Sequence, residues 1–513
     1  MDKIKINIVS WVKKNPVEFW IILGIIIVGA FLRLYKIDQY MTFLGDEGRD
    51  VIIVRKIFTE FHPPLIGPGT SIGNMYLGPL YYYMMAIPLL VTGFSPIGPA
   101  IMIALLGIVT IAFVWFIGRT WFGKKTGIIA AGLYAISPII IIYSRSSWNP
   151  NIMPFFSLLS IYSIWKVWRQ KKYNWLIVMG VSFAFSLQSH YLGLLLAPTL
   201  FVFWLLTFLE LRKTKNTGTF VKKSIIGFIS FLILMSPLLF FDMRHGWMNT
   251  KAIYTFFTVR QTTVSIRPWT AIPKIPEMLN FVNKSVVAGK NSLAAVISSI
   301  VIGLGLIYVF IENFVKKRNF KIKEEYWILI SWLGVGLIGF GIYKQNIYDH
   351  YFGFLFAAPF LLIGIITSKL WSKGIIFKIL ASALLVYLVA VNIIASPLRK
   401  EPNKLLQRSI HVSKVIEENS GGEPLNLAVI ADTNYEDGYK YFLLKDNYPV
   451  VSIDAQVPSS VAKQLFVVCE LIPNSKCDPT HSPKAQVASF GWSKIDNSWE
   501  VDGAIVYRLV HSK

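Results

Sequence analysis

Residues 19–34 read Phe-Trp-Ile-Ile-Leu-Gly-Ile-Ile-Ile-Val-Gly-Ala-Phe-Leu-Arg-Leu, an apolar run that is closed by Arg33-Leu-Tyr-Lys36. A membrane-spanning helix needs about 20 mostly apolar residues, so this run is a candidate span. It has no small-residue cleavage site, which argues against a signal peptide that is removed. We therefore expect a retained first membrane helix whose N-terminus is cytoplasmic, the side on which basic residues gather. The basic residues before the run are Lys3, Lys5, Lys13 and Lys14.

Similar apolar runs recur along most of the chain. Of the 513 residues, 54% are hydrophobic and 15% are charged, which exceeds the apolar content that a soluble protein of this size needs. The composition predicts a multi-pass protein of the cell membrane. The further candidate runs lie near 77–94, 97–118, 126–142, 151–168, 174–189, 190–209, 224–241, 291–311, 325–343, 350–368 and 374–395.

The basic residues decide how many of these runs cross the membrane. The formal charge is +23, and the Lys and Arg residues fall in short clusters between apolar runs, which indicates topology rather than a nucleic-acid partner. If all twelve runs crossed, the clusters would lie outside the cell. Removing 76–93, a run with two prolines and the cluster Tyr81-Tyr-Tyr83, places every cluster in the cytoplasm. The clusters are Arg119–Lys125, Arg169–Lys172, Arg212–Lys215, Lys222-Lys223, Lys316–Arg318 and Lys369 with Lys373.

This topology predicts eleven membrane helices within residues 1–396 and an extracytoplasmic C-terminus. The run at 76–93 then becomes a juxtamembrane helix inside a first external loop at 37–96, and 242–290 forms a second large external loop. From residue 397 to 513 the apolar runs shorten to strand length, at 425–431, 450–453, 465–469 and 504–510, with a helix at 435–445. We predict a small extracytoplasmic α/β domain there. Its Cys469 and Cys477 could form a disulfide or remain free thiols, because their spacing does not decide between the two.

Acidic residues are scarce in the membrane part, so the stretch Gly45-Asp-Glu-Gly-Arg-Asp50 stands out directly after the first span. A solvated loop would need no function for these acids. The two glycines and Arg49 would also allow the backbone to hold a carboxylate against a substrate, as a general base requires. We therefore regard Asp46 and Glu47 as candidate catalytic residues, with Arg49 beside them.

Other polar residues occur at the ends of different spans on the same predicted external side. Ionisable groups at membrane depth are costly and usually have a partner or a function. Each also has a structural alternative, such as headgroup anchoring, an ion pair between Asp242 and Arg244, or a packed histidine. Together they predict a cationic pocket beneath the carboxylates, suited to a lipid phosphate. These candidate substrate-binding residues are Arg145, His190, Tyr191, Asp242, Arg244, His350 and Tyr351.

The order of these motifs resembles that of glycosyltransferase family 39, which includes dolichyl-phosphate-mannose protein mannosyltransferases and is similar to lipid A aminoarabinose transferases. The likeness covers roughly residues 18–370. Asp46 and Glu47 match the acidic pair of the family, and Gly78-Pro-Leu-Tyr-Tyr82 matches its juxtamembrane motif. Further matches are Tyr143-Ser-Arg145, Gln188-Ser-His-Tyr191 and His350-Tyr351. Where the family often has an acid after the Arg145 position, this chain has Trp148-Asn149-Pro150.

The resemblance implies a GT-C membrane fold and inverting transfer of a sugar from a polyprenyl-phosphate donor. Asp46 would be the base, and Glu47 would orient the acceptor or hold Asp46. The acceptor could be a protein, a lipid or a cell-envelope glycan, and the sugar is not specified. Metal dependence stays open, because two carboxylates can bind a divalent metal ion but the same pair can also act without one.

Three alternative functions remain open at the level of sequence. A lipid-linked glycan transporter or flippase would also use ionisable groups at membrane depth, although no Gly/Pro-broken helix pair recurs in two halves. An oligosaccharyltransferase or ligase would move a preassembled glycan, but the C-terminal region lacks a Trp-Trp-Asp-Tyr-Gly motif. A structural receptor would act through its external domain.

Overall fold

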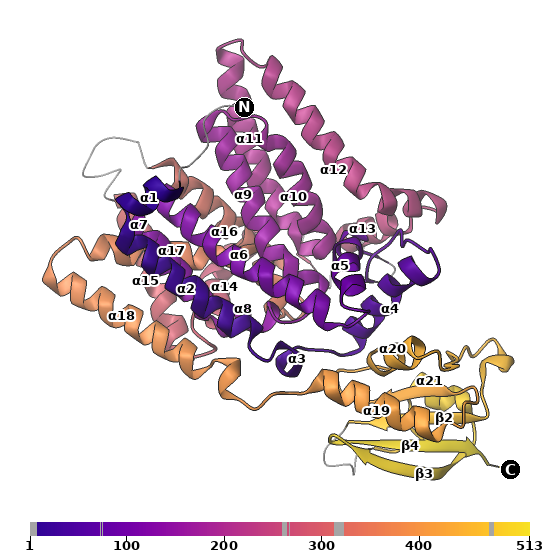
Figure 1. Cartoon of the computed structure of the whole chain (residues 1–513). Helices are drawn as coiled ribbons and strands as arrows, with labels where there is room; N and C mark the ends of the chain where they lie inside the picture. The colour runs from indigo at the N-terminus through magenta and orange to yellow at the C-terminus, as the bar shows by residue number, and fades with distance from the viewer. Residues whose placement is uncertain are drawn as a thin grey trace.

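The computed structural model describes residues 8–71, 73, 75–258, 264–265, 267–311, 323–470 and 477–512. It consists of a large bundle of helices and a small α/β domain formed by the C-terminal region (Figure 1). The long helices of the bundle are α2 (Pro16–Leu34), α6 (Ile97–Phe122), α7 (Lys124–Ile136), α9 (Met153–Gln170), α10 (Trp175–Ser189), α11 (Ala197–Lys213), α12 (Gly218–Arg244), α15 (Ser292–Ile311), α16 (Glu324–Ile342), α17 (Ala357–Leu370) and α18 (Ile375–Ile394). Shorter helices α1 (Ile8–Lys14) and α8 (Pro138–Tyr143) flank α2 and α7 in the chain.

Each of the eleven predicted runs is helical, but not every helix is long enough to be counted as a span. Among the described residues, seven helices are long and apolar enough to cross a membrane, and an eighth is possible if Asp349–Leu355 and Ala357–Leu370, bent by 61°, form one span. The other three runs contain α7 with α8, α9, and α10. Ser137 interrupts the first of these where Pro138 begins α8, and α10 has only 15 residues. The total of eleven spans therefore stays a prediction.

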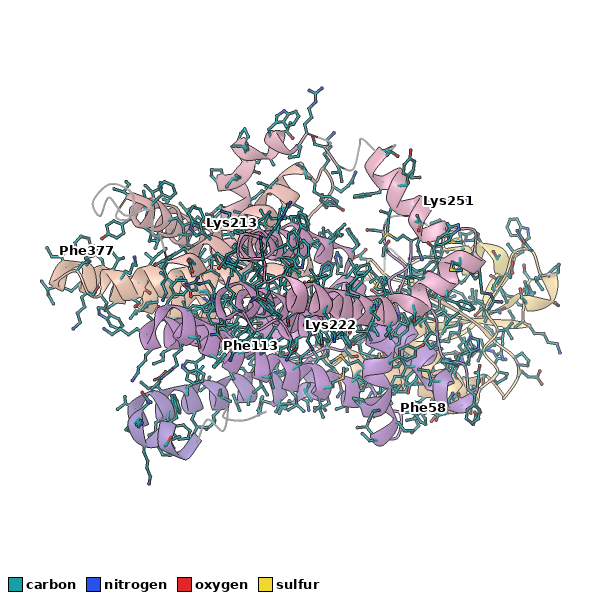
Figure 2. The ribbon with its side chains drawn as sticks, turned by 90° about the horizontal axis from the view of Figure 1, so that it is seen from above. Phe58, Phe113, Lys213, Lys222, Lys251 and Phe377 are labelled. Carbon is teal, nitrogen blue, oxygen red and sulfur yellow. A yellow bond between two sulfur atoms is a disulfide. The ribbon has the colours of Figure 1, made fainter. Side chains whose placement is uncertain are left out.

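Several of the basic clusters predicted to be cytoplasmic contact the ends of neighbouring helices. Arg119 at the end of α6 donates from Nε to Oε1 of Glu18 at the start of α2, at 2.7 Å. Arg169 pairs with Glu324, and the Lys125 ammonium lies 5.4 Å from the ring centroid of Trp371. The cluster at 316–318 lies outside the described residues. In Figure 2, Phe377 at the start of α18 lies at the end of the molecule opposite the C-terminal domain, with Phe58 and Lys251 near that domain.

The first predicted external loop contains three helices, α3 (Ile37–Tyr40), α4 (Gly45–Thr59) and α5 (Leu80–Val91). With 12 residues, α5 is about 18 Å long, too short to cross a hydrocarbon core of about 30 Å. Its buried side chains Tyr81, Tyr82 and Met85 pack in one core with residues of α4 and α6. The second predicted external loop contains α13 (Met248–Thr258) and α14 (Ile275–Val286).

The C-terminal domain has a four-stranded sheet in the order β1-β2-β4-β3. Strands β1 (Asn426–Ile430) and β2 (Gln464–Cys469) are parallel, and β4 (Ala504–His511) runs antiparallel to both β2 and β3 (Ser493–Val501). Helices α19 (Leu405–Asn419) and α20 (Asp437–Lys445) cover one face, with Val412, Tyr439 and Leu443 packed on Val468 and Val506. The short α21 (Ala485–Phe490) packs on the other face.

One strand prediction for this domain was wrong, and one strand was not predicted. Residues 450–453 form only one parallel bridge, between Leu425 and Val450, because Pro449 has no N–H to donate and the Asn426 side chain occupies the Val451 carbonyl oxygen at 2.8 Å. Strand β3 was missed because its polar sequence has no alternation of apolar residues, and most of its side chains are exposed. Cys469 and Cys477 form a disulfide, which agrees with the first of the two alternatives.

Candidate active site

The acidic stretch forms the first turn of α4, which begins at Gly45. The Glu47 side chain turns back toward the start of the helix, where its Oε2 accepts the N–H of Leu44 at 3.0 Å. This contact satisfies an N–H that precedes the helix, as in the second half of a capping box. Glu47 is buried, and burial raises the pKa of its carboxyl group to about 7, an effect that the Leu44 N–H opposes and Asp46 reinforces. Glu47 therefore fixes the turn that carries Asp46.

The raised pKa of Glu47 predicts a pH-dependent stability. The folded protein holds this proton up to about pH 7, whereas the unfolded chain releases it near pH 4.5, so the free energy of unfolding falls as pH rises through that window. The difference corresponds to about 3 kcal/mol. Glu47→Gln retains an oxygen for the Leu44 N–H and has no charge to bury. We expect its thermal midpoint in detergent to exceed that of the wild type at pH 8 and to match it at pH 4. If the variant and the wild type had the same thermal midpoint at pH 8 as well as at pH 4, the raised pKa of Glu47 would be contradicted.

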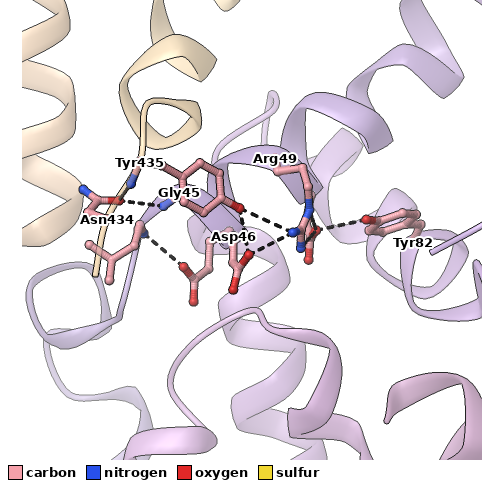
Figure 3. Close-up of polar contacts among 9 residues, drawn as sticks. Gly45, Asp46, Arg49, Tyr82, Asn434 and Tyr435 are labelled. Atoms are coloured by element: carbon pink, nitrogen blue, oxygen red, sulfur yellow. Dashed lines mark hydrogen bonds and ion pairs between the residues drawn. The ribbon is translucent and has the colours of Figure 1, made fainter. Parts of the chain in front are cut away.

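The Asp46 carboxylate is held through one of its two oxygens. Its Oδ1 accepts hydrogen bonds from Arg49 Nη1 at 2.8 Å and from the Tyr435 hydroxyl at 2.7 Å (Figure 3). Within the described part of the chain, no hydrogen bond reaches Oδ2. The side chain is 41% exposed and lines a cavity. Asp46 thus presents a fixed carboxylate with one oxygen available to a ligand.

Arg49 connects two carboxylates of the same helix. Besides the Nη1 hydrogen bond to Asp46, Arg49 donates from Nε and Nη2 to Oδ1 of Asp50, at 3.0 and 2.8 Å. The Asp50 side chain is fully buried and also accepts the Tyr82 hydroxyl at 3.1 Å (Figure 3). Asp50 was seen in the acidic stretch but was not among the candidate residues. The helical spacing could have indicated its role, because position 50 lies one turn after Asp46 and Glu47 on a face that packs inward.

A cavity of about 300 Å³ lies between the first predicted external loop and three segments, at 148–150, 190–191 and 348–351. Six of the ten predicted site residues line it: Asp46, Arg49, His190, Tyr191, His350 and Tyr351. The same cavity is lined by residues that were not predicted to contact substrate, namely Pro68, Gly69, Thr70, Ser71, Leu77, Trp148, Asn149, Pro150 and Tyr348. The Trp148-Asn149-Pro150 segment, where the sequence departs from family 39, is therefore part of the cavity wall.

One wall of this cavity is aromatic. The His350 ring lies 4.6 Å from the Trp148 ring and 5.5 Å from the His190 ring, measured between centroids. His190 also contacts the Tyr351 ring at 4.9 Å. Because Nδ1 of His190 accepts the Leu192 N–H at 3.2 Å, the neutral ring carries its proton on Nε2. The wall combines flat apolar surfaces with donor groups, which suits a sugar ring and the oxygens attached to it.

Arg145 does not line the cavity. It is 1% exposed, and its Nη1 and Nη2 donate to the carbonyl oxygens of Leu32 and Tyr35, both at 2.6 Å. The guanidinium also lies 5.0 Å from the ring centroid of Tyr40. These carbonyls belong to the C-terminal end of α2, which lacks intrahelical partners and attracts cations. The structure therefore assigns Arg145 to capping of α2 rather than to a substrate phosphate.

Asp242 and Arg244 also lie away from the cavity. Asp242 is buried, and its two oxygens accept the N–H groups of Asn249 at 2.6 Å and Thr250 at 3.1 Å, in the first turn of α13. Arg244 is exposed over the ring of Phe240, and no ion pair joins it to Asp242. The prediction that Arg145, Asp242 and Arg244 line a substrate pocket was therefore wrong. Arg145 and Asp242 bind backbone groups at helix ends, and Arg244 is exposed at the surface.

The acidic pair does not converge on a shared position. The Glu47 carboxylate faces Leu44, whereas Asp46 faces Arg49 and Tyr435. Over the ranges that the structure describes, no group of three or more His, Cys, Asp or Glu side chains could hold a metal ion. The Asp46 and Asp50 carboxylates of α4 both pair with the Arg49 guanidinium, whereas the Glu47 carboxylate does not.

Part of the chain is similar in sequence to known mannosyltransferases. The sequence profile of dolichyl-phosphate-mannose-protein mannosyltransferases matches residues 77–241. The protein named "Putative mannosyltransferase YkcB" of Bacillus subtilis (strain 168) is 23% identical over 236 residues, which are 44% of this chain and 30% of the length of YkcB.

Solved structures share the fold over most of the chain. ArnT from Cupriavidus metallidurans bound to undecaprenyl phosphate superposes with a TM-score of 0.60 at 11% identity, covering 95% of this chain and 97% of ArnT. The oligosaccharyltransferase AglB from Archaeoglobus fulgidus, in complex with an inhibitory peptide and a dolichol-phosphate, gives a TM-score of 0.56 at 14% identity, covering 90% of this chain and 70% of AglB.

The chain therefore has the GT-C membrane fold of ArnT and AglB, and residues 77–241 match the mannosyltransferase profile. The resemblance to glycosyltransferase family 39 that the sequence motifs predicted is confirmed by the mannosyltransferase profile and by the likeness to YkcB and ArnT.

Proposed function

We propose that the protein transfers a single sugar from a polyprenyl-phosphate donor to an acceptor hydroxyl on the extracytoplasmic side, with Asp46 as general base. The observation that carries this proposal is the state of the Asp46 carboxylate. Its Oδ1 is held by Arg49 and Tyr435, and its Oδ2 has no hydrogen-bond partner in the described structure while the side chain borders the cavity. A fixed carboxylate with one available oxygen is what proton abstraction from a bound hydroxyl requires.

The reaction would be a single displacement. The acceptor oxygen forms a bond to the anomeric carbon as the bond from that carbon to the phosphate oxygen breaks, and the electron pair leaves with the lipid phosphate. Oδ2 of Asp46 takes the hydroxyl proton. Attack on the face opposite the phosphate inverts the anomeric centre. Glu47 supports this step indirectly, because it fixes the first turn of α4.

The cavity wall offers donors for the departing phosphate. His190 with its proton on Nε2, His350 and the Arg49 guanidinium all line the cavity, and donors that are already in place stabilise negative charge that develops during the reaction. The volume of about 300 Å³ is at the lower end of ligand pockets, which run from roughly 300 to 1,000 Å³. This size favours one sugar unit over a preassembled glycan. The polyprenyl carriers bound by ArnT and AglB support a donor of the same chemical kind.

A donor comparison with purified protein tests the proposal. The protein is incubated in detergent micelles with membrane acceptors and one of three radiolabelled donors: a polyprenyl-phosphate hexose, a nucleotide hexose, or a polyprenyl-diphosphate oligosaccharide. We expect label to reach acceptors only from the polyprenyl-phosphate hexose. Transfer of the oligosaccharide would favour a ligase, and movement of lipid-linked sugar across vesicles without transfer would favour a transporter.

A further inference from the structure

The loop that follows β1 in the C-terminal domain reaches the start of α4. Asn434 Oδ1 accepts the Gly45 N–H at 2.8 Å, and Asn434 Nδ2 donates to Oε1 of Glu470 at 2.6 Å. The Tyr439 hydroxyl donates to the same glutamate oxygen at 2.5 Å. Asn434 is thus tied to the domain core on one side and to the acidic helix on the other, as Figure 3 shows for its contact with Gly45.

The next residue of this loop, Tyr435, contacts the proposed base directly. Its hydroxyl donates to Oδ1 of Asp46 at 2.7 Å, and Arg49 Nη1 lies 3.3 Å from the same hydroxyl. Burial raises the pKa of Tyr435 well above its ordinary value, so the hydroxyl keeps its proton at neutral pH and remains a donor. The Tyr435 N–H also donates to Oδ1 of Asn434 at 2.9 Å, which fixes the backbone that carries the ring.

The two glycines of the acidic stretch are needed for this contact between the domain and α4. A Cβ on Gly45 would lie 2.4 Å from the Tyr435 ring, and a Cβ on Gly48 would lie 2.3 Å from the Asp437 backbone. Neither backbone could approach so closely if α4 carried a side chain at these positions. The Tyr441 hydroxyl adds a contact to the Phe94 carbonyl oxygen at the same interface. The close packing of α4 on the C-terminal domain therefore requires glycine at positions 45 and 48.

We propose that the C-terminal domain completes the active site by supplying Tyr435 as a positioning residue, which holds the Asp46 carboxylate through Oδ1 and directs Oδ2 to the cavity. This inference rests on the proposed function of Asp46. Arg49 alone could hold Oδ1 in more than one rotation of the carboxylate, whereas two donors from different directions restrict it. Small errors in the placement of a reacting group reduce rates strongly.

Tyr435→Phe tests the inference, because it removes the hydroxyl and keeps the ring that packs on Gly45. We expect kcat for sugar transfer to fall about tenfold, with KM for the polyprenyl-phosphate sugar unchanged, since the hydroxyl contacts the base and not the donor. Tyr441→Phe is the matched control, because it removes a hydroxyl from the same interface without touching Asp46. The control should keep the wild-type kcat.

A double variant separates positioning of Asp46 from a general loss of structure. If Tyr435 acts through Asp46, then adding Tyr435→Phe to Asp46→Asn changes the residual rate by less than twofold. Equal kcat values for Tyr435→Phe and Tyr441→Phe, or a further tenfold loss in the double variant, would overturn the inference. In both cases the proposed function would stand if Asp46→Asn alone abolished transfer. If transfer survived Asp46→Asn, the proposed function itself would be wrong.

Discussion

Asp46→Asn should lower kcat for sugar transfer by about a hundredfold to ten-thousandfold, the range in which a general base contributes. Asparagine has the same shape, and its side-chain oxygen can still accept the hydrogen bonds that Arg49 and Tyr435 now donate to Oδ1. It cannot take a proton from the acceptor hydroxyl. The effect should therefore fall on kcat, while KM for the donor and the thermal midpoint in detergent stay close to the wild-type values. The rate of radiolabelled sugar transfer at a saturating donor concentration measures kcat for the variant and the wild type.

The matched control for this variant is Glu60→Gln, the same change of acid to amide at the other end of α4. Glu60 is 55% exposed and pairs with Lys56 at 3.5 Å, and it is not among the residues that line the cavity. We expect the wild-type rate for the control. A rate within threefold of the wild type for Asp46→Asn, in protein with the normal thermal midpoint, would mean that another group takes the proton.

The predicted residues that line the cavity combine a chemical signal with a position at the end of a helix. Asp46 lies in a rare acidic stretch, and His190, Tyr191, His350 and Tyr351 follow or begin apolar runs on one predicted side. Arg145 and Arg244 share those features and yet lie elsewhere. A sequence does not show which carbonyl groups at a helix end lack partners, and Arg145 is used to satisfy the end of α2.

Tyr435 could not be predicted, because it is separated from Asp46 by 389 residues and belongs to a different domain. One weak signal was present. Asp432-Thr-Asn-Tyr435 follows the carboxyl end of β1, which lies parallel to β2, and loops at this edge of parallel sheets commonly carry functional side chains. The fold class could be predicted, because the length of apolar runs and the position of basic clusters can be read from local composition. The number of membrane spans could not, because it depends on helix breaks such as the one at Ser137-Pro138.

Arg49→Leu should have the largest effect on stability among the changes proposed for this site. The Arg49 guanidinium is the charge partner of Asp50, whose side chain is fully buried, and of Asp46. Among the described residues, removing Arg49 leaves the buried Asp50 carboxylate with only the Tyr82 hydroxyl as a donor. Breaking one side of a buried ion pair typically costs about 3–5 kcal/mol. We expect a clear drop in the thermal midpoint in detergent, together with loss of transfer.

The double variant Arg49→Leu with Asp50→Asn separates these two effects. Neutralising Asp50 removes the uncompensated charge, so the thermal midpoint should recover most of its loss. Transfer should not recover, because Asp46 still lacks the Arg49 donor at Oδ1. If activity returned together with stability, Arg49 would serve only the fold. If neither returned, the packing of the guanidinium, and not its charge, would hold α4 in place. Recovery of stability alone would show that one guanidinium both neutralises Asp50 and orients the proposed base.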